Sequence, residues 1–145
     1  MLALNVIQQP DLENTAYDFM TNAFTIFEED ITDTEQKVVA LNLIYTTLYQ
    51  LTCFNAENFD TLCTNALGYS AKLLKRNLQC EATIMGSRLF YCPFRKDGKK
   101  VMDYLRKALK TAEAVMAKSE NFYLLVKILN TYLFYFSIEA EFLSQ

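Results

Sequence analysis

The chain has 145 residues, a formal net charge of −3, and no histidine. A chain of this length forms one domain and buries about 70% of the surface that it exposes when unfolded. Without histidine, the commonest general base and the histidine-containing zinc ligand sets are both missing. Three glycines in the whole chain leave no glycine-rich phosphate loop. We therefore expect no enzyme, no cofactor and no metal site.

Two groups of side chains that can carry chemistry are interpreted as structural. The cysteines lie ten to seventeen positions apart, without a C-x-x-C pair, and are expected to be reduced core thiols: Cys53, Cys63, Cys80 and Cys92. The acidic run Glu28–Asp30 with Asp33 lacks the spacing and the glycine of a calcium loop, so we expect an acidic turn between helices. No signal-peptide pattern is visible, which predicts a cytoplasmic protein.

The charges are distributed unevenly along the chain. Residues 1–70 hold ten acidic residues and one basic residue, whereas residues 71–145 hold seven acidic and thirteen basic residues. A basic half can indicate a nucleic-acid or anionic-membrane surface. The residues that would form it are Lys96, Lys99, Lys100, Arg106, Lys107 and Lys110. Interspersed acidic residues favour the other interpretation, a solvated helical face.

Helical periodicity runs through nearly the whole chain and predicts six helices. The first spans about 11–27. The second begins at Thr32, where the sequence TDTE fits the capping box that satisfies free backbone N–H groups. Its inward face is predicted to hold Val38, Leu41, Tyr45, Leu48 and Leu51. The third spans about 55–75, followed by a turn at 76–77.

The fourth helix is predicted over 78–91, ended by Pro93, because the residue before a proline disfavours helical geometry. The fifth spans about 99–117, and Asp103 and Lys107 in it are spaced as an i,i+4 ion pair. Its inward positions are predicted to be Val101, Leu105, Ala108, Leu109, Ala112 and Met116. The sixth begins at Glu120, with Ser119 as its N-cap.

The odd-numbered predicted helices begin about 43 or 44 residues apart, near 11, 55 and 98. This period is in the range of HEAT and armadillo repeats. We therefore predict an all-α fold, a HEAT-like α-solenoid of about three antiparallel helical hairpins. Gly68 and Gly86 lie equally far from the predicted turn at Asn77, so we expect the third and fourth helices to cross closely where these glycines face each other.

The predicted sixth helix has almost no polar face between Phe122 and Ile138. A helix that is apolar all round is expected to be buried on all sides. At the end of a repeat array, such burial requires further helices or a partner protein. The sequence therefore predicts that residues 1–145 form a single α-solenoid fragment of a longer solenoid.

A basic loop ending in Gly98–Lys100 separates the fourth and fifth predicted helices. It could bind phosphate or nucleic acid, but it has no glycine nest, so we favour a solvated connector between hairpins. Aromatic residues on the second, fourth and sixth helices could be core residues or anchors for a protein partner. These residues are Tyr45, Tyr49, Phe90, Tyr91, Tyr132 and Tyr135.

Three segments resemble a known family in order and spacing over nearly the whole chain. The first two are VVALNLI leading to CFNAEN (38–58) and AKLLK leading to RLFY (71–91). The most specific is GKKVMDYLRKALK leading to ILNTY (98–132), where the family reads G-K-R-V-M-x-x-L-K-K-A-L-K and then I-L-N-R-Y. On these segments, the chain resembles the C-terminal region of the retromer large scaffold subunit, the vacuolar protein sorting-associated protein 35 family.

The resemblance implies a HEAT-like α-solenoid without enzymatic activity. Its concave face would bind the phosphoesterase-fold subunit, vacuolar protein sorting-associated protein 29. The assembly would form a coat on the cytosolic face of endosomes, with only indirect membrane contact, and return cargo to the Golgi or plasma membrane. The full-length protein would also bind the arrestin-like retromer subunit through an N-terminal region that this chain lacks.

The resemblance and the aromatic pattern together give a set of candidate partner-binding residues. The second helix of each hairpin tends to line the concave surface in HEAT-like stacks, which places the candidates there. The set is Tyr45, Tyr49, Arg88, Phe90, Tyr91, Asn130, Tyr132 and Tyr135. The family often has His-Leu-Phe-Trp where this chain has RLFY at 88–91, so a permanent positive charge replaces an imidazole.

Overall fold

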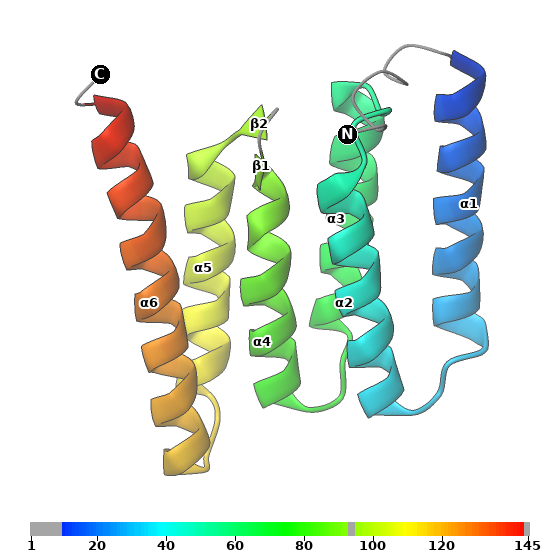
Figure 1. Ribbon diagram of the computed structural model, residues 1–145. Coiled ribbons are helices and arrows are strands. Elements are labelled where there is room, and N and C mark those ends of the chain that lie inside the picture. Colours follow the sequence, from blue (N-terminus) through cyan, green and yellow to red (C-terminus); the bar gives the residue numbers. More distant parts are fainter. Residues whose placement is uncertain (1–9, 93–94, 144–145) are drawn as a thin grey trace.

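The computed structural model describes residues 10–92 and 95–143, and within them the fold is an array of six α-helices (Figure 1). The predicted proline stop at Pro93 lies outside the described residues. The elements are α1 (Pro10–Glu29), α2 (Thr34–Gln50), α3 (Ala56–Ala71), α4 (Arg76–Ser87), the 3₁₀ turn η2 (Arg88–Phe90), β1 (Tyr91–Cys92), β2 (Arg95–Lys96), α5 (Gly98–Glu113) and α6 (Lys118–Leu143). The prediction of an all-α solenoid is confirmed.

Successive helices run in opposite directions and follow one another across the array (Figure 1). Helix α4 contacts α3 and α5, and it also contacts α2 and α6. The even-numbered helices are therefore neighbours, and α4 is the middle one. This arrangement brings side chains from three separate hairpins onto one face of the molecule.

Short polar side chains cap the N-termini of three helices. The starts of α2 and α6 differ from the sequence prediction. Asp33, Asn55 and Asp97 each accept a hydrogen bond from the backbone N–H three residues later, at 2.8–3.1 Å. The capping box predicted from Thr32 is wrong, because the Asp33 carboxylate is itself a strong N-cap and carries the charge that a helix N-terminus favours. Helix α6 begins at Lys118, without the predicted Ser119 cap.

Three helix ends were predicted too late. Helix α3 ends at Ala71, so the turn lies at 72–75, and α4 changes to η2 after Ser87. Helix α5 ends at Glu113, which leaves Met116 outside the helix and 96% exposed instead of inward. Asp103 pairs with Arg106 at 3.3 Å and not with Lys107, whose ammonium lies 4.6 Å from the centroid of the Tyr104 ring.

The hydrophobic core runs through the array between the helices. The larger cluster includes residues of all six helices, and a second cluster joins α4, α5 and α6 around Cys80 and Ile84. The thiols of Cys63, Cys80 and Cys92 are buried, as predicted, whereas Cys53 is partly exposed. Burial raises the pKa of Cys63 to about 12 and that of Cys80 to about 11, so both thiols stay protonated.

The predicted pairing of two glycines is half right. A Cβ on Gly86 would collide with Cδ2 of Leu67 and lie 3.0 Å from Cζ of Tyr45, so α4 does pack closely against α3 and α2 there. Gly68 faces solvent, and a Cβ there would meet no atom within 4 Å. Because α3 ends at Ala71, the two helices are not symmetric about Asn77, and Leu67 rather than Gly68 faces Gly86.

The basic connector between α4 and α5 is not simply solvated. Its strands β1 and β2 pair antiparallel, with Cys92 opposite Arg95. The Asp60 carboxylate on α3 accepts hydrogen bonds of 2.6 Å from Arg95 and from Lys100. The guanidinium of Arg95 also lies 5.6 Å from the Phe59 ring centroid, and its side chain is only 20% exposed. We call Asp60, Arg95 and Lys100 the Asp60 cluster; it ties the connector to α3.

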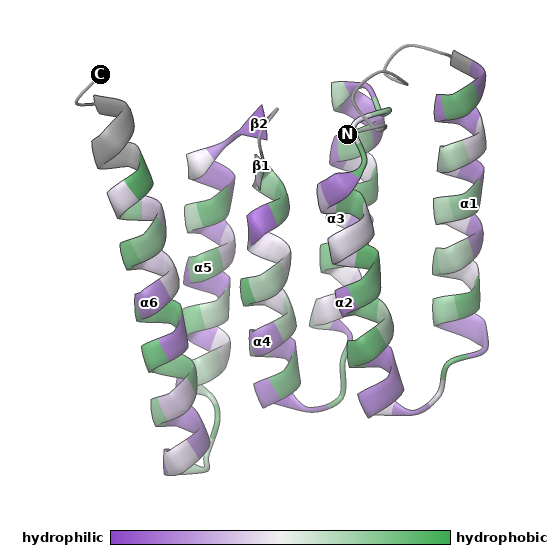
Figure 2. Ribbon diagram, viewed as in Figure 1, coloured by the Kyte–Doolittle hydropathy of each residue, from purple (hydrophilic) through white to green (hydrophobic). Residues whose placement is uncertain are grey.

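Helix α6 is not buried on all sides. Leu124, Ile128 and Tyr135 are buried against the array. The opposite face carries an exposed apolar stripe: Phe122, Val126, Leu129, Leu133 and Phe136. Figure 2 shows apolar residues along the coloured part of α6 beyond its polar first turn. Within residues 10–92 and 95–143, no helix combines the length and hydrophobicity needed to cross a bilayer.

We predict that Asp60→Asn lowers the free energy of unfolding by about 1 kcal/mol at pH 7, a modest value because the carboxylate is 38% exposed. Hydrogen bonds from Lys100 and Arg95 hold the pKa of Asp60 below its usual 3.8. This stabilisation is present above that value and is lost as the pH falls through the folded-state pKa. Urea unfolding from pH 7 to pH 3 should show the two proteins converging, whereas Asp103→Asn, in an exposed pair, should change little.

The two glycines give a matched pair of substitutions. Gly86→Ala should destabilise the fold by about 1–3 kcal/mol, because the methyl group overlaps Leu67 and Tyr45 in a packed interface. Gly68→Ala should stabilise it by about 0.5–1 kcal/mol, because alanine is the better helix former at an open position. Thermal or urea unfolding measures both, and equal effects would contradict the close approach at Gly86.

Candidate partner-binding groove

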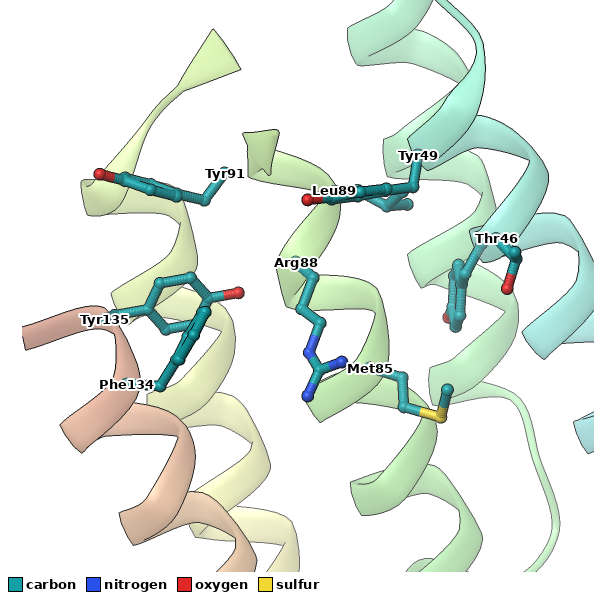
Figure 3. A pocket seen from close by; sticks show the side chains of 9 residues that line it. Thr46, Tyr49, Met85, Arg88, Leu89, Tyr91, Phe134 and Tyr135 are labelled. Carbon is teal, nitrogen blue, oxygen red and sulfur yellow. The ribbon is translucent and has the colours of Figure 1, made fainter. Parts of the chain in front are cut away.

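A groove of about 410 Å³ opens on the face formed by the even-numbered helices (Figure 3). Five of the candidate residues from the sequence line it: Tyr45, Tyr49, Arg88, Tyr91 and Tyr135. They come from α2, η2, β1 and α6, and they span 91 positions of the chain. The tertiary structure therefore brings most of the candidate set into one groove.

Four further residues line the groove that the sequence analysis did not select. They are Thr46 on α2, Met85 on α4, Leu89 on η2 and Phe134 on α6. Each lies within three positions of a candidate residue in the sequence. Leu89 lies in the RLFY segment of the family resemblance and Phe134 lies in the apolar run of α6, but neither pattern distinguishes a partner-facing role from a core role.

Tyr45 forms the deep α2 wall of the groove and also belongs to the core. Its hydroxyl donates a 3.3 Å hydrogen bond to the carbonyl of Ala66 on α3. Its side chain is buried, and this burial raises the pKa of the phenol well above its usual value. Tyr45 therefore fixes α2 against α3, while Tyr49, one turn later and 42% exposed, presents its ring at the surface.

Tyr135 lines the opposite wall and has an unusual hydroxyl. The residue is only 7% exposed, and among the described residues its Oη has no hydrogen-bond partner. The nearby Ser87 hydroxyl donates to the carbonyl of Ile84 at 2.6 Å, and it lies outside hydrogen-bond geometry for Tyr135 Oη. Burial raises the pKa of Tyr135 to about 12, against the opposing effect of the Arg88 charge. The phenol is therefore a neutral hydrogen-bond donor at physiological pH.

Aromatic rings hold Tyr135 in place at the α6 wall. The Tyr91 ring meets it edge to face with centroids 5.6 Å apart, and the Phe134 ring does so at 5.4 Å. These are favourable geometries for aromatic pairs. Because Tyr91 belongs to β1, its position depends on the hairpin that the Asp60 cluster holds against α3.

Among the groove residues that the structure describes, Arg88 alone carries a formal charge. Its side chain is exposed, and among the described residues no carboxylate pairs with it. Figure 3 shows its guanidinium in the middle of the groove, between the aromatic residues of α6 and Met85. The groove therefore combines mostly apolar walls with one unneutralised cation.

Three candidate residues lie elsewhere. Phe90 has no exposed surface; its ring stacks on Tyr104 with centroids 5.2 Å apart. The 3₁₀ turn of η2 points it into the core, away from the groove. Tyr132 is half-buried and packs against both hydrophobic clusters. Asn130 is exposed on α6 but does not line the groove.

The basic surface considered in the sequence analysis is partly neutralised. Lys100 pairs with Asp60, Arg106 pairs with Asp103, and Lys107 lies over the Tyr104 ring. At the acidic turn, Glu28 pairs with Lys72 at 3.3 Å. Within the described residues, no three cysteine or acidic side chains gather as a bound metal ion would require. The ion pairs of Lys100 and Arg106 with carboxylates reduce the positive charge that a phosphate-binding surface would need.

A family model matches the whole chain, and known proteins match most of it. The family model of vacuolar protein sorting-associated protein 35 matches residues 1–145. Vacuolar protein sorting-associated protein 35B of Arabidopsis thaliana is 42% identical over 136 residues, covering 87% of this chain and 17% of that protein. The Schizosaccharomyces pombe vacuolar protein sorting-associated protein 35 is 34% identical over 151 residues, covering 97% of this chain and 18% of that protein.

A more distant relative, from Dictyostelium discoideum, is 28% identical over 141 residues. The chain spans less than a fifth of the length of the curated relatives that it matches. The match of the family model to the whole chain and the identities of 34–42% agree with the resemblance found in the sequence. The chain therefore belongs to the vacuolar protein sorting-associated protein 35 family.

Proposed function

We propose that this chain acts as part of a non-enzymatic scaffold subunit of the retromer coat, in vacuolar protein sorting. The observation that carries the proposal is the family match over residues 1–145, together with relatives that are named for vacuolar protein sorting. The helical array supports it, because α-solenoids present extended surfaces for other proteins. The proposed location is the cytosolic face of endosomes, in retrograde transport of cargo to the Golgi or plasma membrane.

The finer proposal concerns the partner. We propose that the groove face of α2, α4 and α6 binds the phosphoesterase-fold subunit, vacuolar protein sorting-associated protein 29. Tyrosine, arginine and methionine are enriched at protein interfaces, and the groove displays Tyr49, Arg88 and Met85 together. Full-length relatives would bind the arrestin-like subunit through a different region.

We also propose that residues 1–145 are one segment of a longer solenoid. The exposed apolar stripe of α6 supports this, because an apolar face of this extent marks a contact surface. Its residues follow a spacing of four, three, four and three, which is the spacing of a helix seam packed against a neighbouring helix. In this proposal, further helices of the same solenoid cover the stripe.

The alternative function, binding of nucleic acid or anionic membrane through the basic half, has less support. Three of its six basic residues are engaged by Asp60, Asp103 or Tyr104. Salt separates the two functions, because phosphate binding weakens steeply between 50 and 200 mM salt, whereas an apolar interface changes little.

We predict that calorimetric titration of the chain with the phosphoesterase-fold subunit gives binding of similar affinity at low and physiological salt. Tyr49→Ala should weaken the binding about tenfold, because it removes a large exposed ring at the centre of the proposed interface. The matched control is Tyr123→Ala, which removes an exposed tyrosine of α6 outside the groove.

The control variant should bind like the unmodified chain. Absence of binding by a chain whose circular dichroism shows the full helical content would reject the partner assignment. Equal weakening by the two substitutions would mean that the interface lies elsewhere on the even-numbered helices. Binding to vesicles or nucleic acid at low salt only would instead favour the basic surface.

A further inference from the structure

The groove offers hydrogen-bond donors without matching acceptors. Arg88 presents a guanidinium that no described carboxylate neutralises, and Tyr135 presents a hydroxyl with no partner among the described residues. Figure 3 shows both groups pointing into the same part of the groove. A buried hydroxyl that forms no hydrogen bond is destabilising for the free protein. A ligand that brings an acceptor would remove this penalty.

Among the described residues, the rest of the groove provides no charged acceptor that could balance Arg88. The Thr46 hydroxyl donates to the carbonyl of Asn42 at 2.8 Å, and the Tyr45 hydroxyl donates to Ala66. Met85, Leu89 and the aromatic rings are apolar, the hydroxyls of Tyr49 and Tyr91 carry no charge, and no carboxylate among the described residues lines the groove. The ligand must therefore supply both an acceptor and an apolar group.

The charge selects the kind of acceptor. One guanidinium balances one carboxylate, and the planar fork of arginine matches a carboxylate through two parallel hydrogen bonds. A doubly charged phosphate would remain undercompensated between apolar walls, because no second cation among the described residues lines the groove. The Tyr135 hydroxyl is neutral and can donate a hydrogen bond to the same carboxylate.

We propose that the groove accepts a protein segment in which an acidic side chain lies next to an apolar one. The carboxylate binds between the Arg88 guanidinium and the Tyr135 hydroxyl, and the apolar side chain packs against Met85, Leu89 and Tyr49. This inference rests on the proposed function, since it describes the segment by which the partner subunit enters the groove. A volume of about 410 Å³ is large enough for a ligand of this kind.

The experiment uses two capped dipeptides that differ only in charge, acetyl-Phe-Glu-amide and acetyl-Phe-Gln-amide. Each is titrated into the ¹⁵N-labelled chain, and the NMR signals of the Arg88 Nε–H group and the Leu89 backbone amide are followed. The glutamate peptide should bind about fivefold more tightly, because charge-assisted hydrogen bonds at a partly exposed site contribute about one kcal/mol. The shifts should be confined to the groove residues of α2, α4, η2, β1 and α6.

Two substitutions test the donors separately. Arg88→Gln should abolish the preference for the glutamate peptide, whereas Arg106→Gln, which removes an exposed arginine outside the groove, should preserve it. Tyr135→Phe should reduce the preference and leave the free energy of unfolding unchanged or higher, because it removes an unpartnered hydroxyl. A loss of stability in Tyr135→Phe would show that the hydroxyl is already paired and would overturn the two-donor site.

Other outcomes are also decisive. Equal binding of the two peptides, no shifts, or shifts outside the groove would overturn the proposal. Self-association of the chain that disappears in Arg88→Gln would make a second copy the occupant and would overturn it too. The phosphoesterase-fold subunit is titrated in parallel. If the chain distinguishes the two peptides but does not bind the subunit, the partner assignment is rejected and the inference stands. If the subunit binds and Arg88→Gln does not affect that binding, the partner assignment stands and the inference is rejected.

Discussion

The close approach of α4 to its neighbours at Gly86 determines the geometry of the groove face. Because Gly86 has no side chain, the Leu67 side chain of α3 and the Tyr45 ring of α2 occupy the space beside the α4 backbone. Met85 and Arg88 lie within two positions of this contact, so their distance from α2 follows from it. A larger side chain at 86 would push α4 away from the helix that forms the other wall.

A second constraint holds the hairpin at one end of the groove. The Asp60 cluster joins α3 to β2 and to the first turn of α5, and Arg95 lies between the rings of Phe59 and Phe90. Phe90 and Tyr91 are adjacent, one in the core and one at the groove. The Asp60 cluster therefore influences the groove, because holding Phe90 in the core also positions the Tyr91 ring that contacts Tyr135.

The surface of the array has two apolar regions of different character. The groove mixes aromatic rings with an unpaired cation and an unpaired hydroxyl, which suits recognition of a particular segment. The α6 stripe is uniformly apolar and regularly spaced, which suits packing against another helix. In the proposed scaffold, the groove would select a partner and the stripe would extend the array.

Composition and periodicity by themselves determined the all-α class, the six helices, the hairpin order and the burial of residues such as Leu41 and Leu105, because helical periodicity is a local property. Helix ends at Thr32, Lys75 and Ala117 were predicted wrongly, since neighbouring caps and turns compete within a few tenths of a kcal/mol to about one kcal/mol. The sequence also placed Tyr49, Arg88 and Tyr135 in one candidate set.

Only the tertiary structure decided that Phe90 lies in the core, that Arg95 is anchored by Asp60, and that the Tyr135 hydroxyl has no partner among the described residues. Those outcomes depend on contacts between residues 35 or more positions apart, or on local geometry set by packing, and neither leaves a periodic signal in the chain.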